Sequence, residues 1–235
     1  MTSVAVIIPF RDRGIDPLRK ANLDRVVDHS RVYTKTPTVV SDGRDGDAQF
    51  NRSAAYNAGV RECPDAEAFV FTESDMLLDY TQIDQAVCLA RETPGLVVPF
   101  TQYRYLTPED SELVRADQVQ PATCWPESTM DDGKSIGAIN VVSRDTLDLI
   151  GQWDECFEGN WYDDNAMHRA FEVCAGPTRW VDGPAHHLFH LPGWKGDHLT
   201  DADRAATARN KARYDLYRKA QTPERIRELT TQRSH

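Results

Sequence analysis

The stretch Phe69-Val-Phe-Thr-Glu-Ser-Asp75 is an apolar run that ends in two carboxylates. A short continuous apolar run of this kind is typical of a strand that is covered on both faces. Carboxylates buried at the end of such a strand cost free energy unless a positive charge lies beside them. A divalent cation can supply that charge. Acidic residues also end strands as ordinary turn formers, so the stretch by itself leaves both interpretations open.

Apolar runs and helical patterns alternate on either side of this stretch. We expect strands at residues 4–9, 38–41, 68–72 and 95–100, and helices at residues 16–30, 53–61 and 83–91. Small residues in the second helix allow it to pack closely. This alternation predicts an α/β fold with a mostly parallel sheet and helices on both faces. Ligands of such sheets bind at the carboxyl ends of the strands.

The pattern changes after residue 100. Residues 102–134 are polar and rich in proline, and they predict a long irregular loop of the kind that often selects a ligand. After this loop we expect strands at 137–142 and 179–182. We also expect helices at 144–152 and 163–173 and a long polar helix at 201–220. We expect one domain over 1–221, with a nucleotide-binding half (1–100), an acceptor and metal half (101–200) and a C-terminal helix (201–221). Residues 222–235 are expected to be a flexible tail.

The overall composition limits the classes of protein to which the chain can belong. The chain has 235 residues, 40% of them hydrophobic, which suits a globular protein. Its net charge of −10 argues against broad nucleic-acid binding, because a phosphate-tracking surface needs a basic excess. No apolar run is long enough to span a membrane, and the N-terminus lacks the basic start of a signal peptide. The five cysteines are irregularly spaced and predict reduced, mostly buried thiols in a cytoplasmic protein.

Two arginines follow the first strand, in Pro9-Phe10-Arg11-Asp12-Arg13. Arginines at the carboxyl end of a strand can bind a diphosphate or a ribose, although a solvated turn explains the same pattern. The second strand leads into a turn-rich segment that begins at Asp42.

His187 and His190 are three residues apart, a spacing that aims both rings at one point if the backbone makes a tight turn. Two imidazoles and one carboxylate, that of Asp75, suit manganese or another borderline metal better than magnesium. Two ordinary loop histidines are the alternative. Because His186 adjoins the pair, the register is open by one residue.

Trp161-Tyr162-Asp163-Asp164 opens a predicted helix. A carboxylate there complements the helix dipole, and it can also act as a general base toward an acceptor hydroxyl. The two aromatic residues can form a stacking face for a sugar or a base.

Taken in their order along the chain, the segments described above resemble those of the β-1,4-galactosyltransferase family of nucleotide-sugar transferases, which has the GT-A fold. Residues 7–13 resemble that family's Pro-Phe-Arg-Asn-Arg segment, residues 50–52 its Phe-Asn-Arg segment, and residues 69–75 its Phe-Val-Phe-Ser-Asp-Val-Asp strand. The late metal-binding pair and the Trp-Gly-Gly-Glu-Asp-Asp segment also have counterparts. The resemblance covers roughly residues 4–190. It departs where Glu73 replaces Asp, where Asn160-Trp161-Tyr162 replaces the diglycine run, and where His187 replaces the methionine of animal members.

The resemblance implies a role for each matching residue. Asp75, His187 and His190 would bind Mn²⁺ or another divalent cation, and Asp163, or else Asp164, would be the catalytic base. The nucleotide-sugar donor would contact nine residues, namely Pro9, Phe10, Arg11, Arg13, Asp42, Phe50, Arg52, Glu73 and Trp161. The resemblance thus implies a soluble microbial or viral hexosyltransferase, cytoplasmic in a bacterium or a phage-infected cell, that moves a hexose from a UDP-sugar with inversion.

Two other functions stay open at this point. A sugar-nucleotide pyrophosphorylase has a related sheet but normally a glycine-rich first loop, which is absent here. A non-catalytic sugar-binding module would not need the metal, nucleotide and base positions. The acceptor can be a glycan, a protein, a small molecule or a modified DNA base. Basic residues on the C-terminal helix could face nucleic acid, but the net charge favours a solvated helix face.

Overall fold

A six-stranded sheet forms the centre of the computed structural model, which describes residues 3–34, 37–130, 135–193 and 196–232. The strand order is β2-β1-β3-β8-β5-β9. These strands are β1 (Val4–Pro9), β2 (Thr38–Val40), β3 (Ala68–Thr72), β5 (Val97–Val98), β8 (Ile139–Ser143) and β9 (Arg179–Trp180). Every residue of β3 is buried, as its apolar sequence predicts.

Strand direction in this sheet is mixed. β1 pairs in parallel with β2 and β3, as the strand-helix alternation predicts. β8 is antiparallel to both β3 and β5. The chain leaves the sheet after β5 to build a second sheet and re-enters it at β8 in the opposite direction. The fold is therefore α/β, with a parallel first half and an antiparallel strand between β3 and β5.

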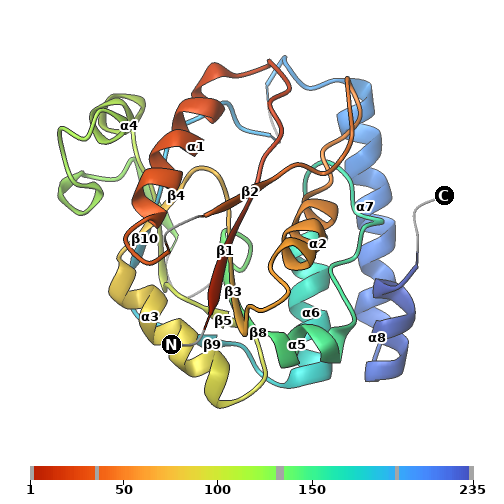
Figure 1. The fold of residues 1–235 in the computed structure, drawn as a ribbon. Helices are drawn as coiled ribbons and strands as arrows, with labels where there is room; N and C mark the ends of the chain where they lie inside the picture. Colours follow the sequence, from red (N-terminus) through yellow and green to blue (C-terminus); the bar gives the residue numbers. More distant parts are fainter. Residues whose placement is uncertain (1–2, 35–36, 131–134, 194–195, 233–235) are drawn as a thin grey trace.

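Helices cover both faces of the sheet (Figure 1). α1 (Pro17–Ser30) and α3 (Tyr80–Glu92) lie on one side. The helices on the other side are α2 (Arg52–Glu62), α5 (Arg144–Ile150), α6 (Asp163–Ala175), α7 (Asp201–Lys219) and α8 (Pro223–Thr230). The apolar core lies between these layers and the buried strands.

Residues 102–130 are more regular than the predicted loop. They form β6 (Gln102–Tyr105), α4 (Pro108–Arg115), the 3-10 turn η1 (Pro121–Thr123) and β7 (Ser128–Met130). β6 and β7 join β4 (Met76–Leu78) and β10 (Pro184–His187) in a second sheet, ordered β4-β10-β6-β7. The loop prediction was wrong here because these strands are short and polar, and because Pro108 starts a helix at its first turn, where proline is tolerated. Residues 131–134 of the predicted loop lie outside the described part.

Helix α2 sits close against β1. Its N-cap is Asn51, whose Oδ1 accepts the Ala54 N–H at 2.9 Å. A Cβ added to Gly59 would lie 2.5 Å from Cγ2 of Ile7, so the absence of a side chain permits the close approach that the small residues predict. This packing places Arg52, the first residue of α2, near the carboxyl end of the parallel strands.

The predicted flexible tail is wrong for residues 223–230, which form α8. Thr222 caps this helix and Pro223 is its first residue. Ile226, Leu229 and Thr230 are buried against α5 and α6. Only two apolar side chains anchor α8, which is too short a pattern to recognise in the sequence.

The five cysteines are free thiols, as predicted, but they are not buried. Four are half-buried and Cys88 is exposed. Within the described ranges, no helix combines the length and apolarity needed to cross a membrane.

We expect Ile226→Ala to lower the free energy of unfolding by about 3 kcal/mol, because it removes a fully buried side chain. Urea denaturation followed by circular dichroism measures this change. Arg225→Ala on the exposed side of the same helix is the matched control and should change stability by less than about 0.5 kcal/mol. Equal effects of the two substitutions would contradict the docking of α8.

Candidate functional site

Asp75, His187 and His190 come together as the spacing predicts. Each offers a ligand atom, and these atoms lie within 4.8 Å of one another. The Nε2 atom of His190 is 2.9 Å from Oδ2 of Asp75, and Nε2 of His187 is 3.9 Å from Oδ1 of the same carboxylate. This arrangement is a three-ligand cluster at the end of β3.

Backbone pairing in the second sheet brings the first histidine to the carboxylate. In the antiparallel register of β10 and β4, His187 lies opposite Met76. One residue further along, the Leu188 N–H donates to the Asp75 carbonyl at 2.8 Å. Two segments more than 100 residues apart therefore meet through strand register.

Side chains from two helices hold the loop that carries His190. Asp16, the N-cap of α1, accepts the Leu191 N–H at 2.7 Å. Ser111 of α4 accepts the Phe189 N–H at 2.8 Å. His190 is thus fixed on both sides by contacts that no local sequence pattern indicates.

The protonation of the cluster suits a bound cation. Nδ1 of His190 lies 2.7 Å from the Leu191 carbonyl, which can only accept, so Nδ1 carries a proton. In the neutral ring, Nε2 then aims a lone pair at Asp75, and a cation between them would satisfy both. Oδ1 of Asp75 is buried and has no hydrogen-bond partner among the described residues. The donor set of two imidazoles and one carboxylate fits a borderline divalent metal.

Burial sets the charges of these groups. It lowers the pKa of His187 to about 4, so that ring is neutral at pH 7, as a metal ligand must be. Burial opposes ionisation of Asp75, but the two imidazoles outweigh it and hold the pKa of that carboxyl well below its usual range. The cluster therefore presents an ionised carboxylate beside at least one neutral ring.

His186 is excluded from the cluster. Successive residues of β10 point to opposite faces of the sheet, so His186 is turned away from Asp75, and it is buried. In the structure, His187 and His190 lie beside Asp75, whereas His186 does not.

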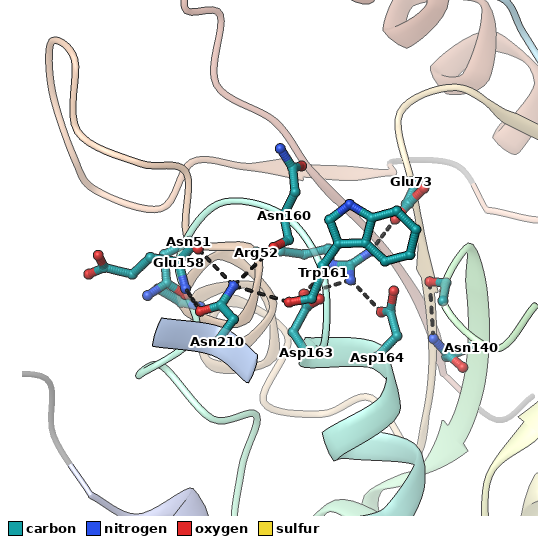
Figure 2. Close-up of polar contacts among 12 residues, drawn as sticks. Asn51, Arg52, Glu73, Asn140, Glu158, Asn160, Trp161, Asp163, Asp164 and Asn210 are labelled. Carbon is teal, nitrogen blue, oxygen red and sulfur yellow. Dashed lines mark hydrogen bonds and ion pairs between the residues drawn. The ribbon is translucent and has the colours of Figure 1, made fainter. Parts of the chain in front are cut away.

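An acidic cluster lies beside the three-ligand site, built around Arg52 (Figure 2). The Arg52 guanidinium pairs with Glu73 at the end of β3 and with Asp163 and Asp164 in the first turn of α6. Its Nη2 is 2.6 Å and its Nε is 3.1 Å from Oδ2 of Asp163. One guanidinium thus joins the two segments that carry the predicted site carboxylates.

One positive charge cannot compensate three clustered negative charges, of which Asp163 is buried and Glu73 and Asp164 are half-buried. Burial raises the pKa of Glu73 to about 8, against the opposing effect of Arg52. Burial also raises the pKa of Asp164 to about 6, and Asp163 adds to that rise by charge repulsion. A carboxyl of this cluster therefore holds a proton near neutral pH.

The chain enters α6 through a strained turn. Trp161 (φ 74°) and Tyr162 (φ 70°) are consecutive non-glycine residues in the left-handed region, which costs about 1–2 kcal/mol for each. Beyond the turn, Gly137 makes room for the site, because a Cβ there would lie 2.2 Å from Oδ2 of Asp164.

One pocket opens on both clusters, and a second pocket adjoins it. The arginine pocket takes in the loop after β1 and the start of α1, and it is lined by residues that include Pro9, Phe10, Arg11, Arg13, Asp16, Arg19, Phe50 and Asp203. The acidic pocket is lined by residues that include Arg52, Glu73, Asp75, Tyr105, Met130, Trp161, Asp163, Asp164, His187 and His190. Residues shared by both linings, such as Pro9, Arg19 and Phe50, make the pockets continuous.

The predicted nucleotide contacts divide among three places. Phe10, Arg11 and Arg13 line the arginine pocket, Arg52, Glu73 and Trp161 line the acidic pocket, and Pro9 and Phe50 line both. Asp42 lines neither of them.

Asp42 instead supports the neighbouring loop. Its Oδ2 accepts the Asn51 N–H at 2.9 Å, and its Oδ1 is 3.1 Å from Nε of Arg11. Arg11 also donates to the carbonyls of Gly46 and Ala48. Much of its hydrogen-bonding capacity is therefore used within the protein.

Two residues that line the pockets were not predicted from the sequence. Arg19 of α1 lines both pockets and places a positive charge near Asp75 and His187. Asp203 of α7 lies in the arginine pocket, where Gln49 donates to it at 2.9 Å. The sequence pattern predicts that both residues lie on solvent-exposed helix faces. Only the packing of the helices turns them toward the site.

No family model matches the sequence, and no curated protein matches it, but solved structures share its fold. A mutant Drosophila β1,4-galactosyltransferase 7, in complex with manganese, UDP-Gal and xylobiose, aligns with a TM-score of 0.56 and 13% identity, over 88% of this chain and 79% of that one. Glucosyl-3-phosphoglycerate synthase of Mycobacterium tuberculosis, with Mn²⁺, UDP-glucose and phosphoglyceric acid, aligns at 0.51 and 14%, over 92% and 79%.

GalNAc-T7 with UDP, GalNAc and Mn²⁺ aligns at a TM-score of 0.54 and 11% identity, over 93% of this chain but only 49% of that one. At these identities the likeness establishes the fold. The chain has the GT-A fold of these glycosyltransferases, which confirms the predicted fold class.

We expect His187→Ala and His190→Ala each to weaken Mn²⁺ binding at least about 100-fold, because each removes one ligand of the cluster. Titration calorimetry with MnCl₂ on the purified protein measures the affinity. His186→Leu, which changes the neighbouring ring on the other face, should leave Mn²⁺ affinity unchanged. Wild-type affinity in His187→Ala would contradict the assignment.

We expect the Asp164 carboxyl to make stability fall as pH rises from about 4 to about 6, because its pKa is raised in the folded state. In that window the unfolded carboxyl has lost its proton while the folded one retains it, so the folded state binds more protons. Urea unfolding of wild type and Asp164→Asn between pH 4 and 8 should show the difference in slope below about pH 6. Parallel stability curves for the two proteins would contradict the raised pKa.

Proposed function

We propose that this protein is a metal-dependent glycosyltransferase that moves a hexose from a nucleotide diphosphate sugar, most simply a UDP-sugar, to an acceptor hydroxyl with inversion. The observation that carries the proposal is the three-ligand cluster of Asp75, His187 and His190, which lines the acidic pocket, the neighbour of the arginine pocket. The GT-A fold supports it, since the similar structures hold Mn²⁺ together with UDP or a UDP-sugar.

The donor would lie across the junction of the two pockets. Asp75, His187 and His190 would hold Mn²⁺ or another divalent cation, which would stabilise negative charge on the diphosphate leaving group. Arg13 and Arg19 line the arginine pocket and would add positive charge for the phosphates. Phe10 and Phe50 would provide apolar walls for the nucleoside.

The first turn of α6 would supply the base. A carboxylate there takes the proton of the acceptor hydroxyl while the acceptor oxygen forms its bond to the anomeric carbon. The bond between that carbon and the diphosphate oxygen breaks, and UDP leaves on the opposite face, which inverts the configuration. Asp163 is our first choice because it matches the family's catalytic Asp. Asp164, with a pKa of about 6, is the second.

The acceptor would enter over the outer wall of the acidic pocket. Tyr105 of β6, Met130 of β7 and Trp161 contribute to that wall. β6 and β7 belong to the segment 102–134 that the sequence singled out for acceptor selection. Aromatic and apolar side chains there suit the face of a sugar ring better than a phosphate backbone.

We expect wild-type protein with Mn²⁺ to release UDP from at least one member of a UDP-hexose panel. Asp75→Asn should lose at least about 100-fold of that activity, because a cation ligand is removed. Asp163→Asn should lower kcat by about 100-fold or more with a near-unchanged donor KM, because it removes the base. UDP release is measured by coupled assay, with Ile226→Ala as the control for general destabilisation.

Full activity of Asp75→Asn would contradict the metal assignment. Pyrophosphate release from UTP and a sugar 1-phosphate, without UDP-sugar hydrolysis, would show a nucleotidyltransferase instead. No binding of UDP with Mn²⁺ present would refute the proposal as a whole.

A further inference from the structure

The turn that leads into α6 lacks the usual means of holding a helix start. Tyr162 is the N-cap of α6, but its backbone is left-handed and its side chain accepts no hydrogen bond from the helix. N-cap residues normally have extended backbone and a capping oxygen. Strained conformations of this kind persist only where the surroundings over-determine them. The start of α6 must therefore be held from outside.

One side chain of α7 supplies that hold. Nδ2 of Asn210 lies 2.9 Å from the Glu158 carbonyl and 3.1 Å from the carbonyls of both Asn160 and Trp161 (Figure 2). Its Oδ1 accepts the Glu158 N–H at 3.2 Å. The amide thus uses both its donors and its acceptor on one turn, and the residue is 1% exposed.

Asn210 belongs to a polar stripe along α7 that faces the site. Asp203, Thr207, Asn210 and Tyr214 recur at spacings of four, three and four, which places them on one face of the helix. Asp203 lines the arginine pocket, and the Tyr214 ring stacks on Tyr162 with centroids 5.8 Å apart. The helix therefore contacts the turn through both a hydrogen-bonding amide and a ring.

We infer that Asn210 is a positioning residue for the acidic cluster, acting through the strained turn. Tyr162 precedes Asp163 directly, so relaxation of its backbone would rotate the first turn of α6 and move Asp163 and Asp164 away from Arg52. The inference rests on the proposed function, in which a carboxylate of that turn is the base. It adds that α7, through Asn210, sets the geometry of the base.

The test compares Asn210→Ala with Arg213→Met, which removes a second, half-buried polar contact of the same helix. Nε of Arg213 pairs with Asp154 at 2.5 Å and does not contact the turn. We expect Asn210→Ala to lower kcat for Mn²⁺-dependent UDP-sugar hydrolysis by about 100-fold with an unchanged donor KM, because a displaced base costs rate and not donor binding. Arg213→Met should lower stability toward urea but keep the wild-type kcat. If Asn210→Ala does not fold, Asn210→Ser replaces it.

A glycine at position 161 provides the rescue. Glycine adopts positive φ without strain, so it removes the need for part of the hold. In the Trp161→Gly background, Asn210→Ala should reduce kcat by less than about 10-fold, because the turn no longer has to be forced. The same cycle measured by urea unfolding should show coupling between positions 161 and 210.

Equal kcat losses in Asn210→Ala and Arg213→Met, or an undiminished loss in the glycine background, would overturn the inference. If the wild-type protein hydrolyses no UDP-sugar, the proposed function fails first and separately. The unfolding cycle then decides whether Asn210 holds the turn, since additive effects at the two positions refute it and coupling supports it.

Discussion

Buried negative charge at the carboxyl end of β3 is the constraint on which the rest of the site depends. Glu73 and Asp75 follow a strand that is buried along its whole length, and isolated carboxylates in such a place would be strongly destabilising. The structure gives each carboxylate a different partner group. Glu73 receives the Arg52 guanidinium from α2, and Asp75 receives two imidazoles from β10 and the loop after it. Elements far apart in the sequence are thereby drawn to one sheet edge.

These two kinds of partner have different chemical consequences. Arg52 serves three carboxylates at once, so the acidic cluster retains a proton and at least one pKa near neutrality. The imidazoles beside Asp75 leave one carboxylate oxygen without a hydrogen-bond partner within the described chain, which suits a cation. A group able to accept a proton and a group able to hold a metal therefore stand side by side, which is the arrangement that transfer from a diphosphate donor requires.

Sequence reasoning found the metal-ligand candidates because their chemistry is local. A carboxylate at a strand end and two histidines three residues apart are visible without a fold, and so is the alternation that predicts the sheet. It did not foresee that Arg52 lies in the acidic cluster, that Asp42 supports a loop, or that α8 docks. These outcomes depend on contacts between residues that are 9 to 111 positions apart, or on two apolar side chains, and neither leaves a periodic signal.

The sequence by itself determined the order along the chain of the six main-sheet strands, the apolar strand that ends in acid, and the residue types able to bind a cation. Each of these follows from local chemistry and periodicity. Tertiary structure alone decided which histidines meet Asp75, because the register of β10 on β4 turns His187 and not His186 toward it, and contacts from α1 and α4 hold the loop of His190. It also decided how α6 begins, because Asn210 of α7 donates to a carbonyl of the left-handed turn before Asp163. Register and helix packing are properties of the assembled chain, and no short stretch of sequence contains them.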